Sequence, residues 1–181
     1  MIRAATAEDH IDLAKLIMLA MGTLAYKFVK ESEDAVPLFE HFNALEKNQY
    51  SFENILVYDD GEIRGLICAY DGADLDRLRK PFLSYISSTY GVTVIPEDET
   101  QPGEYYIDCL AVFPENQGSG IGKKLINAMA SQAKSNGYNS LGLLVKKGNP
   151  EAKKLYLKTG FRIKDERKFV GDVYEHLQLE L

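Results

Sequence analysis

The segment YYIDCLAVF, residues 105 to 113, restricts the fold more than any other part of the chain. It is a nearly continuous apolar run of strand length, a pattern typical of a β-strand that is covered on both faces. Such a strand needs helices above and below its sheet. A proline, a glycine-rich run and a helical pattern follow it directly, which predicts a strand–turn–helix unit at this point.

The remaining periodicity predicts a chain in which strands and helices alternate. We expect strands at 2–5, 141–145, 161–168 and 173–180, a hairpin at 55–70, and helices at 7–21, 34–50, 119–136 and 150–160. Within 71–103, residues 73–88 are partly helical in pattern and Pro96–Glu99 are interpreted as an exposed loop. The order predicts an α/β (α+β) fold with a mixed sheet, helices on both faces and a single domain over residues 1–181.

Composition and charge exclude several classes of function. An apolar fraction of 45% and a charged fraction of 27% are ordinary for a globular protein. A net charge of -6 argues against a nucleic-acid partner and suits a cationic substrate better than an anionic one. The start has no signal-peptide pattern, and no apolar run approaches the length of a membrane span, so a cytoplasmic protein is expected.

The cysteines and histidines predict no metal site. Cys68 and Cys109 each lie in an apolar, strand-like run, so we expect reduced, buried thiols. The three histidines form neither an HExxH motif nor a Cys/His cluster.

The run QGSGIGKK, residues 117 to 124, has the residue types of a phosphate-binding loop. It does not fit a P-loop, because Gln117 and Lys124 stand where a glycine and a Mg²⁺-binding hydroxyl are required. It does not fit the dinucleotide fingerprint either, because Lys123 replaces the third glycine. A Q-x-x-G-x-G pattern at a helix N-terminus remains. Its free N–H groups can hold a pyrophosphate, or its small residues can serve tight packing alone.

A second motif decides between these interpretations. LAVFPENQGSGIGKKL, followed about thirty residues later by NPEAKKLYLKTGF, closely resembles the GNAT superfamily of acyl-CoA-dependent N-acetyltransferases. The resemblance covers roughly 105–162. It implies a mostly antiparallel sheet of about six or seven strands, in which a central parallel pair, here 105–113 and 141–145, splays apart to receive acetyl-CoA.

The resemblance also implies cofactor-binding residues. Leu110, Ala111 and Val112 would pair with the pantetheine arm as an added strand does. The loop Gln117, Gly118, Ser119, Gly120, Ile121, Gly122 and Lys123 would hold the pyrophosphate, with Lys123 or Lys124 adding charge. Asn149, in a motif with Ala152, would hydrogen-bond the pantetheine. Gln117 stands where the family often has Arg, which removes one cation from the loop.

Two residues are the catalytic candidates. Tyr156 matches the family's tyrosine beside the sulfur, and a phenol can protonate a leaving thiolate; the alternative is a packed tyrosine. Asp108, a carboxylate in an otherwise apolar strand, is the leading general base, because burial would raise its pKa. Its alternative role is a carboxylate satisfied by neighbouring groups, and Glu104 and Tyr106 are weaker candidates for the base.

We therefore expect an N-acetyltransferase that moves the acetyl group of acetyl-CoA to a primary amine of a small molecule or peptide by direct attack. Acceptors are expected against 26–50 and 71–103, where acidic and aromatic residues could hold a cation; the alternative is a solvated loop. A non-catalytic acyl-CoA-binding or sensor module is the competing function, and an ATPase is a poor third. No metal, nucleic acid or membrane partner is expected, and the protein is a monomer or homodimer.

Overall fold

The computed structural model describes residues 1–181 and is built on one seven-stranded sheet. Its order is β1 (Ile2–Ala4), β2 (Ile55–Asp59), β3 (Ile63–Asp71), β4 (Tyr105–Val112), β5 (Ser140–Lys146), β7 (Asp172–Glu180) and β6 (Arg162–Phe169). All neighbouring strands are antiparallel except the parallel pair β4–β5 at the centre. The predicted mixed sheet with a central parallel pair is confirmed.

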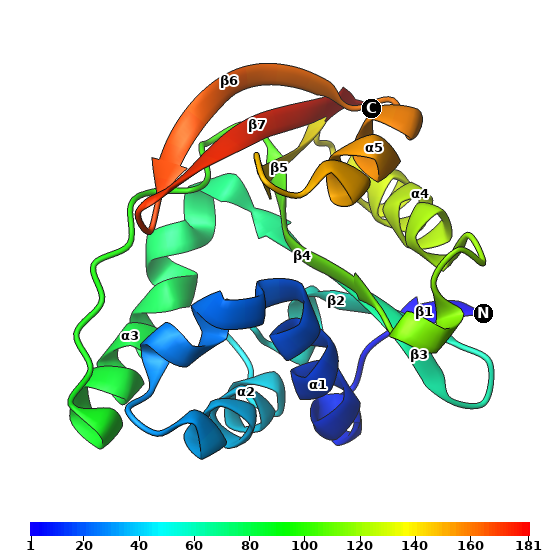
Figure 1. Ribbon diagram of the computed structural model, residues 1–181. Coiled ribbons are helices and arrows are strands. Elements are labelled where there is room, and N and C mark those ends of the chain that lie inside the picture. Colours follow the sequence, from blue (N-terminus) through cyan, green and yellow to red (C-terminus); the bar gives the residue numbers. More distant parts are fainter.

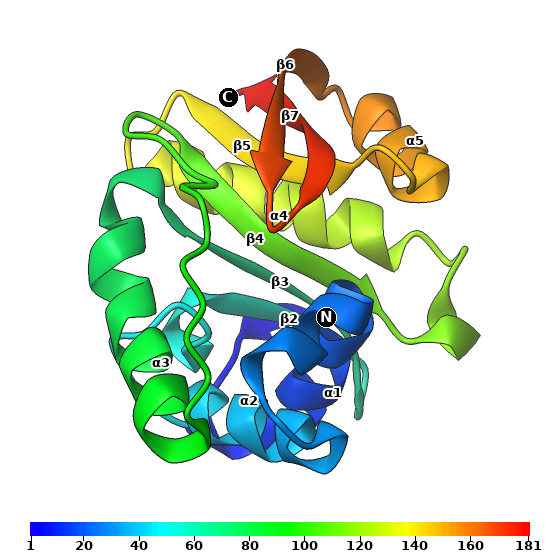
Figure 2. The same ribbon diagram turned by 60° about the vertical axis from the view of Figure 1, so that its left-hand side comes forward.

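Five α-helices cover the two faces of this sheet (Figure 1). They are α1 (His10–Met21), α2 (Ala35–Asn43), α3 (Leu75–Tyr90), α4 (Ile121–Ser135) and α5 (Pro150–Lys158). Figure 2 shows α1 and α2 below β4, with α4 and α5 on the opposite side. None of the helices combines the length and the apolar character that a bilayer crossing requires.

The burial of β4 confirms that its apolar run is covered on both faces. Cys109 and Ala111 belong to the core that α1 and α2 close, whereas Leu110 and Val112 pack into the core beneath α4. Residues on one strand thus contribute to two separate hydrophobic cores, which fixes the sheet between the two helical layers.

The ladder between β4 and β5 ends long before the strands do. Only Tyr105, Tyr106 and Ile107 pair with β5, opposite Leu141, Gly142 and Leu143. Beyond this point β4 stays paired with β3, and β5 stays paired with β7. The two central strands therefore part from Asp108 and Leu144 onwards, as the family resemblance predicted.

A β-bulge stands where the strands part. Cys68 pairs with Cys109 and Ala69 with Ile107, which leaves Asp108 without a partner on β3. A bulge breaks the two-residue alternation and redirects side chains. The Asp108 carboxylate accordingly accepts hydrogen bonds from Tyr70 and Gln49, on the side of the sheet where Cys109 is also buried. Both cysteines are free and buried, as expected.

Two predicted boundaries are wrong. The helix expected over 34–50 ends at Asn43, because the Asn48 side chain donates to the carbonyls of Phe42 and Leu45 and the Asn43 side chain donates to that of Tyr50. Such side-chain bonds offer the backbone an alternative to the helix. The partly helical pattern over 73–88 is instead a complete helix, α3, which continues through Pro81.

A buried hydrogen-bonded cluster fastens the paired end of the central strands. Oε2 of Glu104 lies 2.9 Å from Nε2 of His176 and accepts a 2.8 Å hydrogen bond from Gln178. Glu104 lies over Gly142 of β5, where a Cβ atom would stand 2.2 Å from the carboxylate oxygen. The glycine is therefore required by the close approach of the carboxylate and not by backbone conformation.

We predict that Gly142→Ala lowers the free energy of unfolding by about 3 to 5 kcal/mol, because the methyl group must displace a buried, paired carboxylate. Urea unfolding measures the change. Gly148→Ala, at a position with open space around the added methyl, should cost about 0.5 kcal/mol or less. In a Glu104→Ala background the Gly142→Ala cost should shrink; an equal cost in both backgrounds would contradict this assignment.

Candidate functional site

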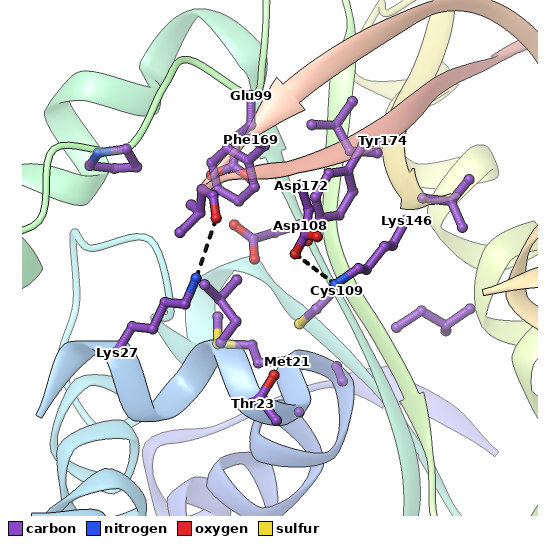
Figure 3. Close-up of a pocket in the computed structure, with 18 of the residues that line it drawn as sticks. Met21, Thr23, Lys27, Glu99, Asp108, Cys109, Lys146, Phe169, Asp172 and Tyr174 are labelled. Carbon is purple, nitrogen blue, oxygen red and sulfur yellow. Dashed lines mark hydrogen bonds and ion pairs between the residues drawn. The ribbon is translucent and has the colours of Figure 1, made fainter. Parts of the chain in front are cut away.

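A cavity of about 510 Å³ opens where β4 and β5 part. Its walls come from the end of α1 and the 3₁₀ helix Gly22–Phe28, from α3, β4, β5 and α5, and from the β6–β7 turn. Figure 3 shows this arrangement, with Met21, Thr23 and Lys27 below, Phe169 and Tyr174 above, and Asp108 and Cys109 between them. Elements from the whole length of the chain therefore meet at one site.

The parted strands supply an open backbone edge to this cavity. Leu110 of β4 and Val145 of β5 both line it, at positions where the β4–β5 ladder no longer exists. Unpaired strand N–H and C=O groups can bind an extended ligand as an additional strand. The site thus has the form of a slot between two strands.

The N-terminus of α5 lies along the same slot. Asn149 caps this helix, because its side-chain oxygen accepts a 3.2 Å hydrogen bond from the N–H of Ala152. Asn149, Ala152 and Tyr156 all line the cavity. The capping bond fixes the orientation of the Asn149 amide and directs its nitrogen away from the helix.

The glycine run forms a cradle of backbone donors at the start of α4. None of the six N–H groups from Gly118 to Lys123 has a backbone acceptor. Gly118 and Gly120 have φ values of +78° and +82°, and open space surrounds the position of a Cβ on each. Free N–H groups at a helix N-terminus attract anions through hydrogen bonds and the helix dipole.

Tight packing also contributes to this run, as the second interpretation from the sequence expected. A Cβ on Gly122 would meet Leu155 at 3.3 Å, with Leu110 and Val112 close behind. Gly122 therefore lets α4 approach α5 and β4, whereas Gly118 and Gly120 shape the donor loop.

The other predicted cofactor residues surround this loop outside the cavity. The Gln117 side chain donates to the carbonyl of Val112 and so fastens the loop to the end of β4. Ala111 is buried on the α1 side. Lys124 lies 5.2 Å from the ring centroid of Tyr58, and Ser119 donates to the carbonyl of Asn116.

Asp108 lies inside the cavity with two neutral donors. Tyr70 donates to its carboxylate at 2.7 Å, and Gln49 donates at 2.6 Å. Burial raises the pKa of Asp108, although these two hydrogen bonds act in the opposite direction. A carboxylate in this state is a better proton acceptor than a fully hydrated one.

Glu99 is a second carboxylate in the cavity, which the sequence places only within an acidic segment that could hold a cation or be a solvated loop. It lines the cavity, where Tyr106 donates to it at 3.2 Å and Gln49 at 3.3 Å. Burial, and then the charge of Asp108, raise the pKa of Glu99 to about 8. The only local sign was the acidic run Glu97–Glu99, which does not show which member points inward.

Tyr156 lies on the α5 wall of the cavity. Its ring packs edge-to-face against Phe161 at 5.6 Å. Burial, together with the nearby Cys109 thiol, raises the pKa of Tyr156, so the phenol stays protonated at neutral pH. A protonated phenol in a cavity is able to donate a proton to a group bound there.

Of the two weaker candidates for the base, one lines the cavity and the other does not. Tyr106 lines the cavity and donates to Glu99. Glu104 is fully buried in its pair with His176 and does not reach the cavity. No group of three or more His, Cys, Asp or Glu side chains is arranged to hold a metal ion.

Comparison with known proteins agrees with this geometry. The sequence profile of the Acetyltransferase (GNAT) family matches residues 19–161. No curated protein matches the chain. The crystal structure of an acetyltransferase is 31% identical, with a TM-score of 0.83 over 99% of this chain and 98% of that one.

Two further solved structures have the same fold. An N-acetyltransferase from Staphylococcus aureus Mu50 is 25% identical, with a TM-score of 0.80 over 99% of this chain and all of its own. The PaiA N-acetyltransferase from Thermoplasma acidophilum, solved in complex with coenzyme A, is 16% identical with a TM-score of 0.61, and covers 100% of this chain and 98% of its own.

The splayed central pair, the donor cradle at the start of α4 and the profile match over most of the chain lead to one assignment: the protein belongs to the GNAT family of acetyltransferases.

Proposed function

We propose that the protein is a single-domain N-acetyltransferase that moves the acetyl group of acetyl-CoA to a primary amine by direct attack in a ternary complex. The observation that carries this proposal is the slot between β4 and β5, which places an open strand edge, Asp108 and Tyr156 around one cavity. Substrate positioning of this kind lowers the entropic part of the barrier.

In this proposal the cofactor lies along the slot. Its pantetheine arm pairs with the backbone of Leu110 and Val112, and the Asn149 side-chain nitrogen donates to a pantetheine carbonyl. The pyrophosphate accepts hydrogen bonds from the N–H groups of Gly118 to Lys123, which lack backbone acceptors. The thioester then lies near Tyr156, at the inner end of the open edge.

The chemistry follows from two groups that line the same cavity. Asp108 accepts a proton from the acceptor's ammonium, and the free amine attacks the thioester carbon. The carbon–sulfur bond breaks as the amide bond forms, and Tyr156 donates its proton to the departing thiolate. The second proton of the attacking nitrogen leaves through water and neutralises the Tyr156 phenolate, and Asp108 releases its proton to water, which restores the enzyme.

A non-catalytic acyl-CoA-binding module is the alternative, and it makes a different prediction. Such a module would bind acetyl-CoA without amine-dependent release of coenzyme A. Asp108 favours the enzyme, because a carboxylate with no cation beside it costs stability and is retained most readily where it is used.

A matched pair of glycine variants tests whether the donor cradle binds acetyl-CoA. Gly120→Ala should raise the Kd of acetyl-CoA about 10-fold, because a side chain disfavours the positive φ that aims the donors. Gly137→Ala replaces a glycine of similar φ (+88°) at the far end of α4, also in open space. It should bind acetyl-CoA as the wild type does. Isothermal titration calorimetry measures both, and equal weakening would contradict the cradle.

Removal of the proposed acid should affect turnover and spare binding. Tyr156→Phe is expected to lower kcat about 100-fold or more with little change in the Kd of acetyl-CoA, because only the proton donor is lost. Tyr138→Phe alters a tyrosine that packs on Tyr105 away from the cavity and serves as the control. Undiminished kcat in Tyr156→Phe would remove this residue from the mechanism.

Protonation of Asp108 should set the acidic limb of the pH profile of kcat/KM. Because burial raises its pKa, kcat/KM should fall as pH drops through a value above the ordinary carboxyl range, where the base becomes protonated. Tyr70→Phe removes a hydrogen bond that lowers this pKa, so the limb should move to higher pH. Asp108→Asn should lower kcat/KM about 100-fold; if it keeps the wild-type limb, Asp108 is not the base.

A further inference from the structure

The cavity contains two carboxylates that no cation balances. Asp172, which also lines it, is paired with Lys146 at 2.6 Å. Glu99 and Asp108 form no salt bridge, and their hydrogen-bond donors are the neutral side chains of Gln49, Tyr70 and Tyr106. This pair is called the acid pair below.

The nearby cations are bound to other groups. Lys27 donates to the carbonyl of Val170 at 3.3 Å. Arg79 is held by Asp76 at 2.8 Å and by Asp98 at 2.6 Å. The charge of Arg79 lowers the pKa of Glu99 somewhat, but burial and Asp108 outweigh it. Lys27 and Arg79 thus line the same cavity, but neither forms an ion pair with a member of the acid pair.

Buried charge without a partner is costly, and protonation is how a protein reduces this cost. Burial and the charge of Asp108 raise the pKa of Glu99 to about 8, and burial also raises the pKa of Asp108. Positive charge from a ligand would stabilise the ionised form of both carboxylates.

The two carboxylates reach the cavity from different segments of the chain. Asp108 is next to Cys109 and Leu110, at the open edge of β4. Glu99 comes from the segment that joins α3 to β4 and lies with Phe169 near the tip of the β6–β7 hairpin (Figure 3). An amine that reacts beside Asp108 therefore has the rest of its molecule directed towards Glu99.

The surroundings of Glu99 suit a second cationic group. Tyr106, Phe169 and Tyr174 line this part of the cavity with aromatic rings, which attract cations through their faces. Gln49 Nε2 bonds both carboxylates, at 2.6 Å to Asp108 and 3.3 Å to Glu99, so the two lie close together. A short aliphatic chain is enough to connect a group at one with a group at the other.

The cavity also has a cover that limits the size of the acceptor. Val170, at the hairpin tip, donates its N–H to Glu97 at 2.8 Å, and its carbonyl accepts from Lys27 at 3.3 Å. The hairpin is thereby bonded to the segment before β4 on one side and to the 3₁₀ helix on the other. A small molecule fits beneath this cover more readily than a folded protein surface.

We propose that the acceptor is a small aliphatic diamine, whose reactive amine lies at Asp108 and whose second ammonium group is held by Glu99. This inference rests on the proposed acetyltransferase function and adds Glu99 as the residue that determines the substrate class. Glu99 acts by binding the acceptor, and Asp108 remains the proton acceptor.

Steady-state kinetics with a matched series of acceptors tests the inference. The probes are 1,4-diaminobutane, 1-aminobutane, 4-aminobutan-1-ol and a short peptide with a free N-terminus, each with acetyl-CoA and with coenzyme A release as the readout. The wild type should prefer the diamine to the monoamine in kcat/KM by about 10- to 100-fold, the usual strength of a charge-assisted hydrogen bond. Glu99→Gln should remove most of this preference.

Asp74→Asn is the control. It removes a carboxylate that is 42% exposed, pairs with Arg77 and does not line the cavity, so it should keep the diamine preference. Equal rates with the monoamine and the diamine, a preference for the peptide, or an unchanged preference in Glu99→Gln would each overturn the inference and leave the acetyltransferase function standing. Absence of transfer to every amine would overturn both.

Calorimetry gives a readout that does not need turnover. The titration is of 1,4-diaminobutane into the complex with coenzyme A at pH 7, in two buffers of different ionisation enthalpy. A dication lowers the pKa of Glu99 from about 8, so wild-type binding should release more protons than binding to Glu99→Gln. Equal proton release by the two proteins would contradict a second ammonium at Glu99.

Discussion

The early end of the β4–β5 ladder is the constraint on which the site depends. Three residue pairs hold the strands together, and the bulge at Asp108 stands at the next position. The paired end is secured by the buried cluster of Glu104, His176 and Gln178, which connects β4 to β7 across Gly142. Because each parting strand keeps its outer neighbour, the sheet opens at its centre without losing its other hydrogen bonds.

The elements that form the proposed cofactor half of the site could be predicted because their signals are local. A buried strand, a proline, a glycine run and a capped helix follow one another in the sequence, and each has its own residue preferences. The acceptor half could not, because tertiary contacts decide it. The bulge at Asp108 shifts the register by one residue in an apolar run that looks regular, and Glu99 is directed inward by a segment without periodicity. Likewise, α2 ends early because the Asn48 side chain bonds the carbonyls of Phe42 and Leu45.

The contrast between the cofactor half and the acceptor half of the site also separates the family motifs from the rest of the cavity lining. The family profile ends at residue 161, whereas Phe169, Asp172 and Tyr174 of the β6–β7 hairpin line the cavity beyond that point. Glu99 and Gln49 lie inside the matched range, but outside the two motifs that identify the family. In the proposed function, acceptor choice depends on residues outside the motifs that identify the family, and such grafted sites let one fold host many functions.

The lack of a cation beside the acid pair also has a chemical consequence. A lysine or arginine in the place of Gln49 would stabilise both carboxylates, lower their pKa values and so weaken Asp108 as a proton acceptor. Neutral donors orient the carboxylates without removing their basicity, and burial among tyrosines raises their pKa values further. In the proposed function, the ammonium of the acceptor supplies positive charge beside them. Affinity for a cationic acceptor and basicity towards its ammonium would then have one physical origin, since both follow from the neutral donors of the acid pair.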